Sequence, residues 1–343
     1  MPRVPISDFL ALPHPLLDVR APVEYAQGHM PGALSLPLFS DEERAAIGTA
    51  YKQVNQETAV ELGLEFFGPR MAATVRRARE LAPGREVRLH CWRGGMRSGA
   101  MQWLLELAGF RVYLLEGGYK AYRRAVLADL EAPRPWRVLA GFTGSGKTEV
   151  LHALAGPAHR QAVLDLEGLA HHKGSSFGSI GQAPQPTQEQ FENNLGAALA
   201  ALPAATPIWV EDESRRIGRL TLPAALYAQL QAAPRWELRV PRAVRVAKLA
   251  AEYGAEDPAA LTAAVERLRK RLGGLATQQA VAAIAEKNFG RMVELVLDYY
   301  DKTYAYTMQQ TTATELHSVA TDSADGAANA AALLALVAAR AIT

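Results

Sequence analysis

The stretch that most limits the fold is GFTGSGKT at 141–148, which fits the pattern G-x-x-x-x-G-K-[ST] in full. Residues 136–140 (WRVLA) before it form the apolar run of a buried strand, and residues 149–154 after it have helical spacing. A strand, a glycine-rich loop and a helix are the context that this pattern requires. The pattern therefore predicts a phosphate-binding loop in an α/β domain, because glycines let backbone N–H groups approach phosphate oxygens. Its predicted phosphate-binding residues are Gly141, Gly144, Ser145, Gly146, Lys147 and Thr148.

Two side chains of this loop have specific expected roles. Lys147 is expected to reach the terminal phosphates, and Thr148 is expected to bind Mg²⁺. An acidic residue at the end of a strand is the usual second ligand. The candidates are Asp165, near the end of a predicted strand at 162–166, and Glu211 or Asp212, after a predicted strand at 208–210, and the sequence does not choose between the last two.

A second loop, HCWRGGMRS at 90–98, holds Cys91, the only cysteine of the 343 residues. Residues 86–90 (EVRLH) predict a short buried strand before it, and residues 99–107 predict a helix after it. Cys91 is then expected at the carboxyl end of a strand, where α/β folds place their sites. Gly94 and Gly95 favour a nest of inward-pointing N–H groups.

Positive charge surrounds the same cysteine. Arg93 and Arg97 add charge, and so does the start of the following helix. These groups favour thiolate over thiol and predict a lowered pKa and a nucleophilic Cys91. A lone cysteine is otherwise most often a core residue. By contrast, Asp18 and Arg20 are expected to form an internal ion pair.

Strands and helices alternate along both halves of the chain, which predicts α/β domains with mostly parallel sheets. We expect two domains, at 1–132 and 136–343, joined by the stiff linker PRP at 133–135. The part of the second domain beyond Pro241 is expected to be almost entirely helical and basic. Residues 168–181, rich in Gly, Ser and His, are expected to form an active-site loop.

The composition is that of a globular protein, with 49% hydrophobic and 21% charged residues and a net charge of +2. No apolar run approaches the roughly 20 residues of a membrane span. The lack of such a run predicts no membrane partner. One cysteine cannot form an internal disulfide, so we expect a cytoplasmic protein.

Basic residues gather in clusters that a polyanion could contact, although a charge run is usually only a solvated face. The candidates for contact with a nucleic-acid backbone are Arg76, Arg77, Arg215, Arg216, Arg242, Arg245, Lys270 and Arg271.

Segments 16–33, 91–97 and 114–123 together resemble a rhodanese domain. The chain as a whole resembles the bacterial tRNA 2-selenouridine synthase family, in which a rhodanese domain precedes a P-loop NTPase-like domain. The segments that carry this wider resemblance, besides the two loops, are 41–53 (DEERAAIGTAYKQ), 165–178 (DLEGLAHHKGSSFG), 210–218 (VEDESRRIG), 270–274 (KRLGG) and 299–306 (YYDKTYAY).

The resemblance implies a tRNA substrate with 2-thiouridine at the wobble position. It implies exchange of sulfur for selenium with selenophosphate as donor, through an S-geranyl intermediate made from geranyl diphosphate. Cys91 would attack or carry selenium, and Arg93 and Arg97 would hold the anionic group. The loop at 141–148 would bind geranyl diphosphate or selenophosphate. No tightly bound cofactor is implied, and an enzyme that makes selenophosphate is an expected partner.

Three alternatives remain open from the sequence. The first is a P-loop kinase or ATPase with a regulatory rhodanese module. The second is a plain thiosulfate sulfurtransferase fused to an inert nucleotide-binding scaffold. The third is a tRNA-binding protein without catalytic activity.

Overall fold

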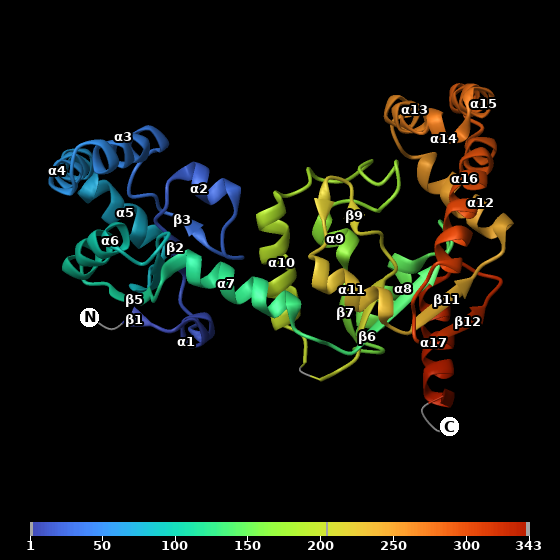
Figure 1. Ribbon diagram of the computed structural model, residues 1–343, viewed down its shortest axis with the longest axis horizontal. Helices are drawn as coiled ribbons and strands as arrows, with labels where there is room; N and C mark the ends of the chain where they lie inside the picture. The colour runs from blue at the N-terminus through green and yellow to red at the C-terminus, as the bar shows by residue number, and fades with distance from the viewer. Residues whose placement is uncertain (1–2, 204, 341–343) are drawn as a thin grey trace. The chain divides into compact units, whose positions relative to one another are not determined.

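The computed structural model describes residues 3–203 and 205–340 (Figure 1). The chain divides into two compact units. The first contains Met1–Asp129 together with Glu192–Ala197, and the second contains Leu130–Phe191 and Ala198–Thr343. Residues 192–197 therefore belong to the first unit, although the predicted division at 132–136 assigns them to the second domain.

The first unit is built on a parallel sheet of strand order β1-β5-β4-β2-β3. Buried apolar residues of neighbouring strands meet in register, as Leu17 does with Leu89 and Val87 with Val112. The core of this unit forms on these side chains. The strands are β1 (Arg3–Val4), β2 (Leu16–Asp18), β3 (Leu34–Ser35), β4 (Glu86–His90) and β5 (Arg111–Leu115).

Helices connect these strands. The helix after the cysteine loop begins at Met96 rather than at Gly99, so Arg97 and Ser98 lie in its first turn. This earlier start brings both side chains onto the helix end that faces the loop. The helices are α1 (Ile6–Ala11), α2 (Pro22–Gln27), α3 (Asp41–Gln53), α4 (Gln56–Phe67), the 3₁₀ turn η1 (Gly68–Arg70), α5 (Met71–Leu81), α6 (Met96–Leu107) and α7 (Gly118–Glu131).

The second unit contains a parallel sheet of order β12-β11-β6-β8-β7 and a small antiparallel hairpin, β9-β10. The predicted α/β class with parallel sheets is thus confirmed in both units. The strands are β6 (Trp136–Gly141), β7 (Ala162–Leu164), β8 (Ile208–Glu211), β9 (Arg216–Ile217), β10 (Leu220–Thr221), β11 (Arg235–Arg239) and β12 (Leu316–Ala320).

Strand β12 corrects the expectation that the chain beyond Pro241 is almost all helical. It pairs with β11 in parallel, and Arg235 lies opposite Leu316. Its five residues alternate between exposed and buried, with only His317 and Val319 facing inward. So short and weakly apolar an edge strand gives little periodic signal in the sequence.

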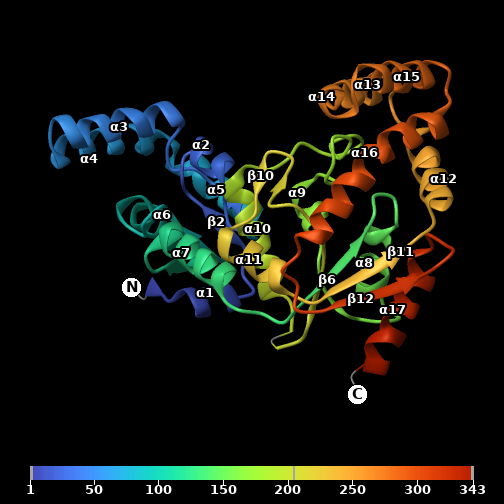
Figure 2. The same ribbon diagram turned by 45° about the vertical axis from the view of Figure 1, so that its right-hand side comes forward.

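The C-terminal helices form a second layer of structure in this unit. Figure 2 shows α13, α14 and α15 beyond the sheet, joined to it through α12 and α16. Their own buried cluster includes Leu261, Ala280 and Val296, while Leu139, Trp209 and others fill the core around the sheet. The helices that follow β6 along the chain are α8 (Lys147–Ala155), α9 (Leu166–Ala170), α10 (Gln188–Ala200), α11 (Ala224–Ala232), α12 (Arg242–Tyr253), α13 (Pro258–Arg267), α14 (Arg269–Leu272), α15 (Gly274–Ala285), α16 (Phe289–Gln309) and α17 (Gly326–Arg340), and the middle of α10 belongs to the first unit.

Candidate functional site

Cys91 follows the last residue of β4 and is only 3% exposed. Its Sγ lies 3.1 Å from the Oγ of Ser98, which is fully buried in the first turn of α6. Burial, the largest effect, opposes ionisation of the thiol. The hydrogen bond with Ser98, the backbone N–H of Arg93 and the charge of Arg97 outweigh it and lower the pKa of Cys91. The predicted activated cysteine thus has a structural basis.

The two arginines of the loop act differently from each other. Arg97 is half-buried, and its Nη1 lies 2.5 Å from Oε2 of Glu24 on α2. Its charge still favours the Cys91 thiolate. Arg93 contributes through its backbone N–H, and its side chain is exposed. Glu24 was not among the predicted site residues, because no spacing in the sequence links it to position 97.

Glycines bring two backbone segments into close contact beneath the cysteine. Gly94 has φ +67°, and a Cβ there would lie 2.8 Å from the carbonyl oxygen of Leu115. Gly118 has φ +60°, and a Cβ there would lie 2.5 Å from the carbonyl oxygen of Cys91. Neither position accepts a larger residue without backbone movement. The turn at 116–119 is therefore part of the cysteine site.

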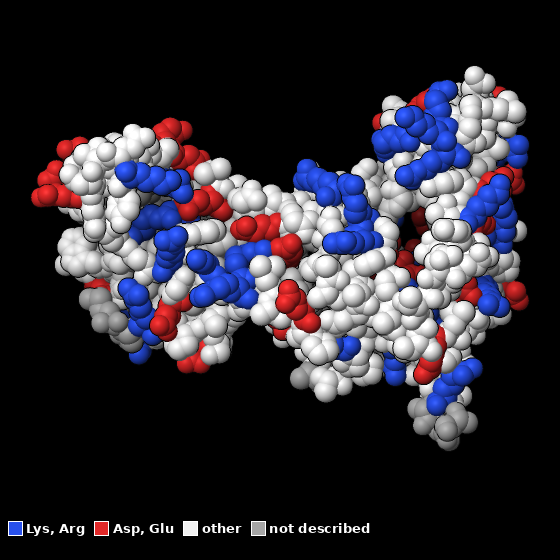
Figure 3. All heavy atoms as spheres, in the orientation of Figure 1, with Lys and Arg blue, Asp and Glu red and all other residues white. Residues whose placement is uncertain are grey.

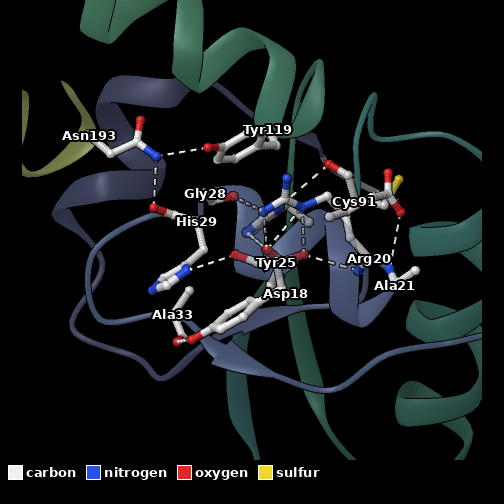
Figure 4. Close-up of polar contacts among 12 residues, drawn as sticks. Asp18, Arg20, Ala21, Tyr25, Gly28, His29, Ala33, Cys91, Tyr119 and Asn193 are labelled. Carbon is white, nitrogen blue, oxygen red and sulfur yellow. Dashed lines mark hydrogen bonds and ion pairs between the residues drawn. The ribbon is translucent and has the colours of Figure 1, made fainter. Parts of the chain in front are cut away.

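Behind this loop lies a buried ion pair (Figure 4). Arg20 donates from Nη2 to Oδ2 of Asp18 at 2.6 Å and to the carbonyl of Gly28 at 2.7 Å, and both charged side chains are fully buried. The guanidinium also stacks on the ring of Tyr119, 3.7 Å from its centroid. The expected internal ion pair of Asp18 and Arg20 is confirmed, and Asp18 lies opposite His90 at the carboxyl end of β4, directly before the cysteine.

The glycine-rich loop of the second unit joins β6 to α8. Gly141, Gly144 and Gly146 have φ values of +153°, +81° and +81°, and a Cβ on Gly144 would lie 2.8 Å from Leu249. Lys147 is the first residue of α8, and its Nζ donates to the carbonyl of Gly141 at 2.9 Å. Backbone N–H groups at a helix start favour bound anions. The Ser145 hydroxyl is buried and, within the described residues, has no hydrogen-bond partner.

A cavity of about 380 Å³ opens beside this loop. One wall is apolar and comes from α12 and from the segment before α10; it consists of Phe177, Ile180, Leu249 and Tyr253. The charged residues that line the same cavity are Lys147, Lys173, Lys248, Glu149, Glu167, Glu213, Glu252 and Glu256. The expectation that 168–181 forms an active-site loop agrees with this lining.

The carboxylate that Thr148 contacts is that of Glu167, rather than that of Asp165, Glu211 or Asp212, which were the predicted candidates. The Oγ1 of Thr148 donates to Oε2 of Glu167 at 3.0 Å. Glu213 lines the same cavity, and its pKa is raised well above the ordinary value by burial first and then by Glu167. Glu211 accepts the backbone N–H of Glu167 at 2.6 Å, and burial raises its pKa to about 8.

The two predicted aspartates have other partners. Asp165 accepts the backbone N–H of Gly168 and pairs with His152 at 2.9 Å, while Asp212 pairs with Arg235 at 3.2 Å. Asp165 and Asp212 are thus not the acids that contact Thr148. If Mg²⁺ bound at this loop, the hydroxyl of Thr148 and the carboxylate of Glu167 would be the oxygens placed to hold it, beside phosphate oxygens and water.

The predicted basic residues separate into exposed and buried ones. Arg245 is only 4% exposed; it pairs with Asp301 at 2.9 Å and donates to the carbonyl of Thr143 at 3.2 Å. Its prediction as a nucleic-acid contact is therefore wrong, because a buried side chain that braces the phosphate loop cannot reach RNA. Arg242 is exposed and pairs with Asp298 at 2.6 Å. The remaining candidates, all exposed, are Arg76, Arg77, Arg215, Arg216, Lys270 and Arg271.

Two exposed basic groups lie in the second unit. Figure 3 shows basic side chains over the β9–β10 hairpin and over α13 and α14, with acidic atoms visible in the hollow between them. Arg215 and Arg216 belong to the first group, and Lys270 and Arg271 belong to the second. No helix of the described residues is long and apolar enough to cross a membrane.

Comparison with known proteins matches both units. Residues 134–331 match the family described as tRNA 2-selenouridine synthase AAA domain, and residues 7–125 match the rhodanese-like domain. A tRNA 2-selenouridine synthase of Marinobacter nauticus is 40% identical over 332 residues, which cover 86% of this chain and 89% of that protein. Another, of Chromohalobacter salexigens, is 37% identical over 341 residues, 89% of this chain and 91% of that protein. The chain belongs to the tRNA 2-selenouridine synthase family.

Proposed function

We propose that this protein is a tRNA 2-selenouridine synthase. It replaces the sulfur of a wobble 2-thiouridine by selenium, with selenophosphate as donor and an S-geranyl base as intermediate. The observation that supports the intermediate most directly is the cavity in which a phosphate-binding loop meets an apolar wall.

That cavity fits geranyl diphosphate better than it fits selenophosphate, which has no apolar part. Leu249 lies against the phosphate loop at Gly144, and Tyr253 follows one helical turn later, about 6 Å along α12. Phe177 stacks on Tyr253 with ring centroids 5.1 Å apart. A diphosphate held by the loop amides and Lys147 would direct its hydrocarbon chain along this wall.

The first step is S-alkylation of the base. The thiocarbonyl sulfur attacks C1 of geranyl diphosphate, the C1–O bond breaks and diphosphate leaves, while the N3 proton of the base passes to solvent. Lys147 and the loop amides stabilise the charge that develops on the leaving diphosphate. Mg²⁺, if held by Thr148 and Glu167, would supply further charge stabilisation to the same oxygens.

The second step uses Cys91. Its thiolate attacks C2 of the alkylated base, and geranylthiolate leaves and takes a proton from solvent. The selenium of selenophosphate then attacks C2, Cys91 leaves as thiolate, and water cleaves the P–Se bond to release phosphate. No oxidant is needed, whereas a perselenide on Cys91 formed from selenophosphate would need one. The lowered pKa of Cys91 suits it both as nucleophile and as leaving group.

The exposed basic groups on the second unit are proposed to hold the tRNA backbone. Arg215 and Arg216 are exposed at the start of β9, and Lys270 and Arg271 are exposed on α14. Phosphate contacts from such side chains position RNA without reading its sequence. Because the donor is selenophosphate, an enzyme that makes it is the proposed supplying partner.

The test is mass spectrometry of nucleosides from 2-thiouridine tRNA incubated with the purified protein. Geranyl diphosphate is added first and selenophosphate second. The S-geranyl nucleoside is expected after the first addition, and the selenated nucleoside is expected after the second. An unchanged nucleoside together with steady ATP cleavage would replace this proposal by a kinase or ATPase, and cleavage of thiosulfate alone would replace it by a sulfurtransferase.

Two variants separate the steps. Lys147→Ala is expected to lose the S-geranyl product, whereas Cys91→Ser is expected to form it and then stop. If Cys91→Ser gave wild-type yields of selenated nucleoside, the role assigned to the thiol would be wrong.

A further inference from the structure

We propose that Asn193 is a positioning residue for the reactive loop around Cys91. The side chain comes from α10, about 100 residues after the cysteine in the chain, and lies in the segment Glu192–Ala197 that belongs to the first unit. The inference concerns the chemistry of the thiol alone, so it stands or falls separately from the proposed tRNA reaction.

The amide of Asn193 is fully buried, and its NH₂ and its carbonyl oxygen both form hydrogen bonds. Figure 4 shows the two bonds from the NH₂ group. Nδ2 donates to the Oη of Tyr119 at 2.7 Å and to the carbonyl of His29 at 2.9 Å. Oδ1 accepts from Nη1 of Arg123 at 2.7 Å. A buried amide is tolerated when its polar groups are hydrogen-bonded. This one joins α10 to α7, through Tyr119 and Arg123, and to the turn after α2, through His29.

Tyr119 is the partner that leads to the cysteine. Its side chain is fully buried, and its ring lies over the guanidinium of Arg20, 3.7 Å from Cζ to the ring centroid. Its ring is also stacked on His90, at 6.0 Å between centroids. The hydroxyl that Asn193 binds therefore fixes a ring packed against the residues directly behind the loop.

The backbone of the same residue touches the loop itself. The N–H of Tyr119 donates to the carbonyl of Cys91 at 2.9 Å, and the N–H of Lys120 donates to the carbonyl of Trp92 at 2.9 Å. Gly118 packs so closely that a Cβ would lie 2.5 Å from both the Cys91 carbonyl oxygen and the Gly94 nitrogen. A shift of Tyr119 must therefore move the peptide groups that surround the sulfur.

Through these contacts Asn193 affects how well the loop stabilises the Cys91 thiolate. The backbone N–H of Arg93 is one of the groups that favour the ionised sulfur, and it lies in the loop segment that residues 118–120 support. If Asn193 is removed, Tyr119 loses a hydrogen bond that holds it in place and the loop amides lose alignment. The thiolate is then less well stabilised.

The test measures the reactivity of Cys91 in the full-length protein. Because the chain has a single cysteine, the mass increase after iodoacetamide treatment reports on Cys91 alone. The alkylation rate is followed against pH for the wild type, Asn193→Ala and Tyr119→Phe. Arg124→Ala is the control, since Arg124 is an exposed residue on α7.

For Asn193→Ala we expect the pH midpoint of alkylation to rise by about one, so that alkylation is about tenfold slower at pH values below the wild-type midpoint. Tyr119→Phe keeps the stacked ring and removes only the hydroxyl, so a smaller change in the same direction is expected. The double variant should resemble Asn193→Ala, because both changes break one link. The Arg124→Ala profile should match that of the wild type.

Other results would overturn the proposal. Asn193→Ala with a lower melting temperature but an unchanged alkylation midpoint would leave Asn193 a purely structural residue. Independent, additive effects of Asn193→Ala and Tyr119→Phe would break the proposed link between them. Should Asn193→Ala fail to fold, Tyr119→Phe carries the test, and an unchanged midpoint there would contradict the proposal.

Discussion

The sulfur of Cys91 lies 3.1 Å from the hydroxyl oxygen of Ser98, and the same hydroxyl lies 3.1 Å from the carbonyl oxygen of Gly95. A hydroxyl has one hydrogen, so it can donate to only one of these acceptors at a time. In the thiol form it donates to Gly95 while the S–H donates to it. In the thiolate form it turns to the sulfur, which makes Ser98 a hydrogen-bond donor to the charged state.

Ser98→Ala is therefore expected to raise the pKa of Cys91. A hydrogen bond to a charged group contributes about 1.5–3 kcal/mol, which corresponds to roughly one to two pH units. The pH dependence of alkylation measures the change. Gly99→Ala on the same helix turn is the control, since a Cβ there meets no atom within 4 Å. An equal midpoint in Ser98→Ala and Gly99→Ala would contradict the role of the hydroxyl.

The burial of His90 predicts how the free energy of unfolding of the first unit depends on pH. It is fully buried beneath the loop, and burial lowers its pKa from 6.5 to about 4, although Asp18 partly offsets this. The unfolded chain binds a proton near pH 6.5 and the folded protein does not until about pH 4. The neutral imidazole of His90 therefore makes its full contribution to the free energy of unfolding above pH 6.5. As the pH falls from 6.5 to 4, the free energy of unfolding decreases by about 3 kcal/mol in total.

In His90→Gln, the free energy of unfolding is expected to decrease less between pH 6.5 and pH 4 than in the wild type. Hydrogen exchange of the β4 amides between pH 4 and 7 measures the local free energy of opening. His14→Gln is the control, because His14 lies near the surface and stacks on Tyr113. The same slope in the wild type and in His90→Gln would show that another group titrates in this window.

Lys147→Ala tests the phosphate loop by binding rather than by turnover. Loss of charge-assisted contacts to a diphosphate is expected to cost about 2–4 kcal/mol, or roughly 30-fold or more in affinity. Titration calorimetry with geranyl diphosphate measures the difference. Lys302→Ala removes the same charge from an exposed position on α16 and should bind like the wild type. Unchanged affinity in Lys147→Ala would place the diphosphate elsewhere.

The parts of the site that were predictable from sequence are those built from consecutive residues. The loop around Cys91 and the loop ending at Lys147 each contain their own strand end, glycines and helix start. Local residues therefore fix both the backbone path and the anion-binding amides. For the same reason the internal pairing of Asp18 with Arg20, two residues apart, was predicted correctly.

The parts that were not predictable depend on contacts between distant residues. Glu24 reaches Arg97 only after the sheet has formed, and Asn193 reaches Tyr119 only through the path of α10. The burial of Arg245 depends on Asp301 of α16, a helix that begins more than 40 residues later in the chain and packs directly on α12. A basic residue on an amphipathic helix looks the same in sequence whether its partner is RNA or a buried carboxylate.

Arg245 and Arg216 provide a final test, because both were candidates for RNA contact and the structure separates them. Arg216 is exposed on β9, so Arg216→Ala should weaken tRNA binding and reduce the slope of log affinity against log salt by about one. Arg245→Ala leaves the Asp301 carboxylate without its bidentate partner and should cost about 3–5 kcal/mol of stability. Its salt slope, measured below its melting temperature, should equal that of the wild type. A reduced slope in Arg245→Ala with normal stability would mean that Arg245 reaches the RNA after all, against its burial and its contact with the phosphate loop.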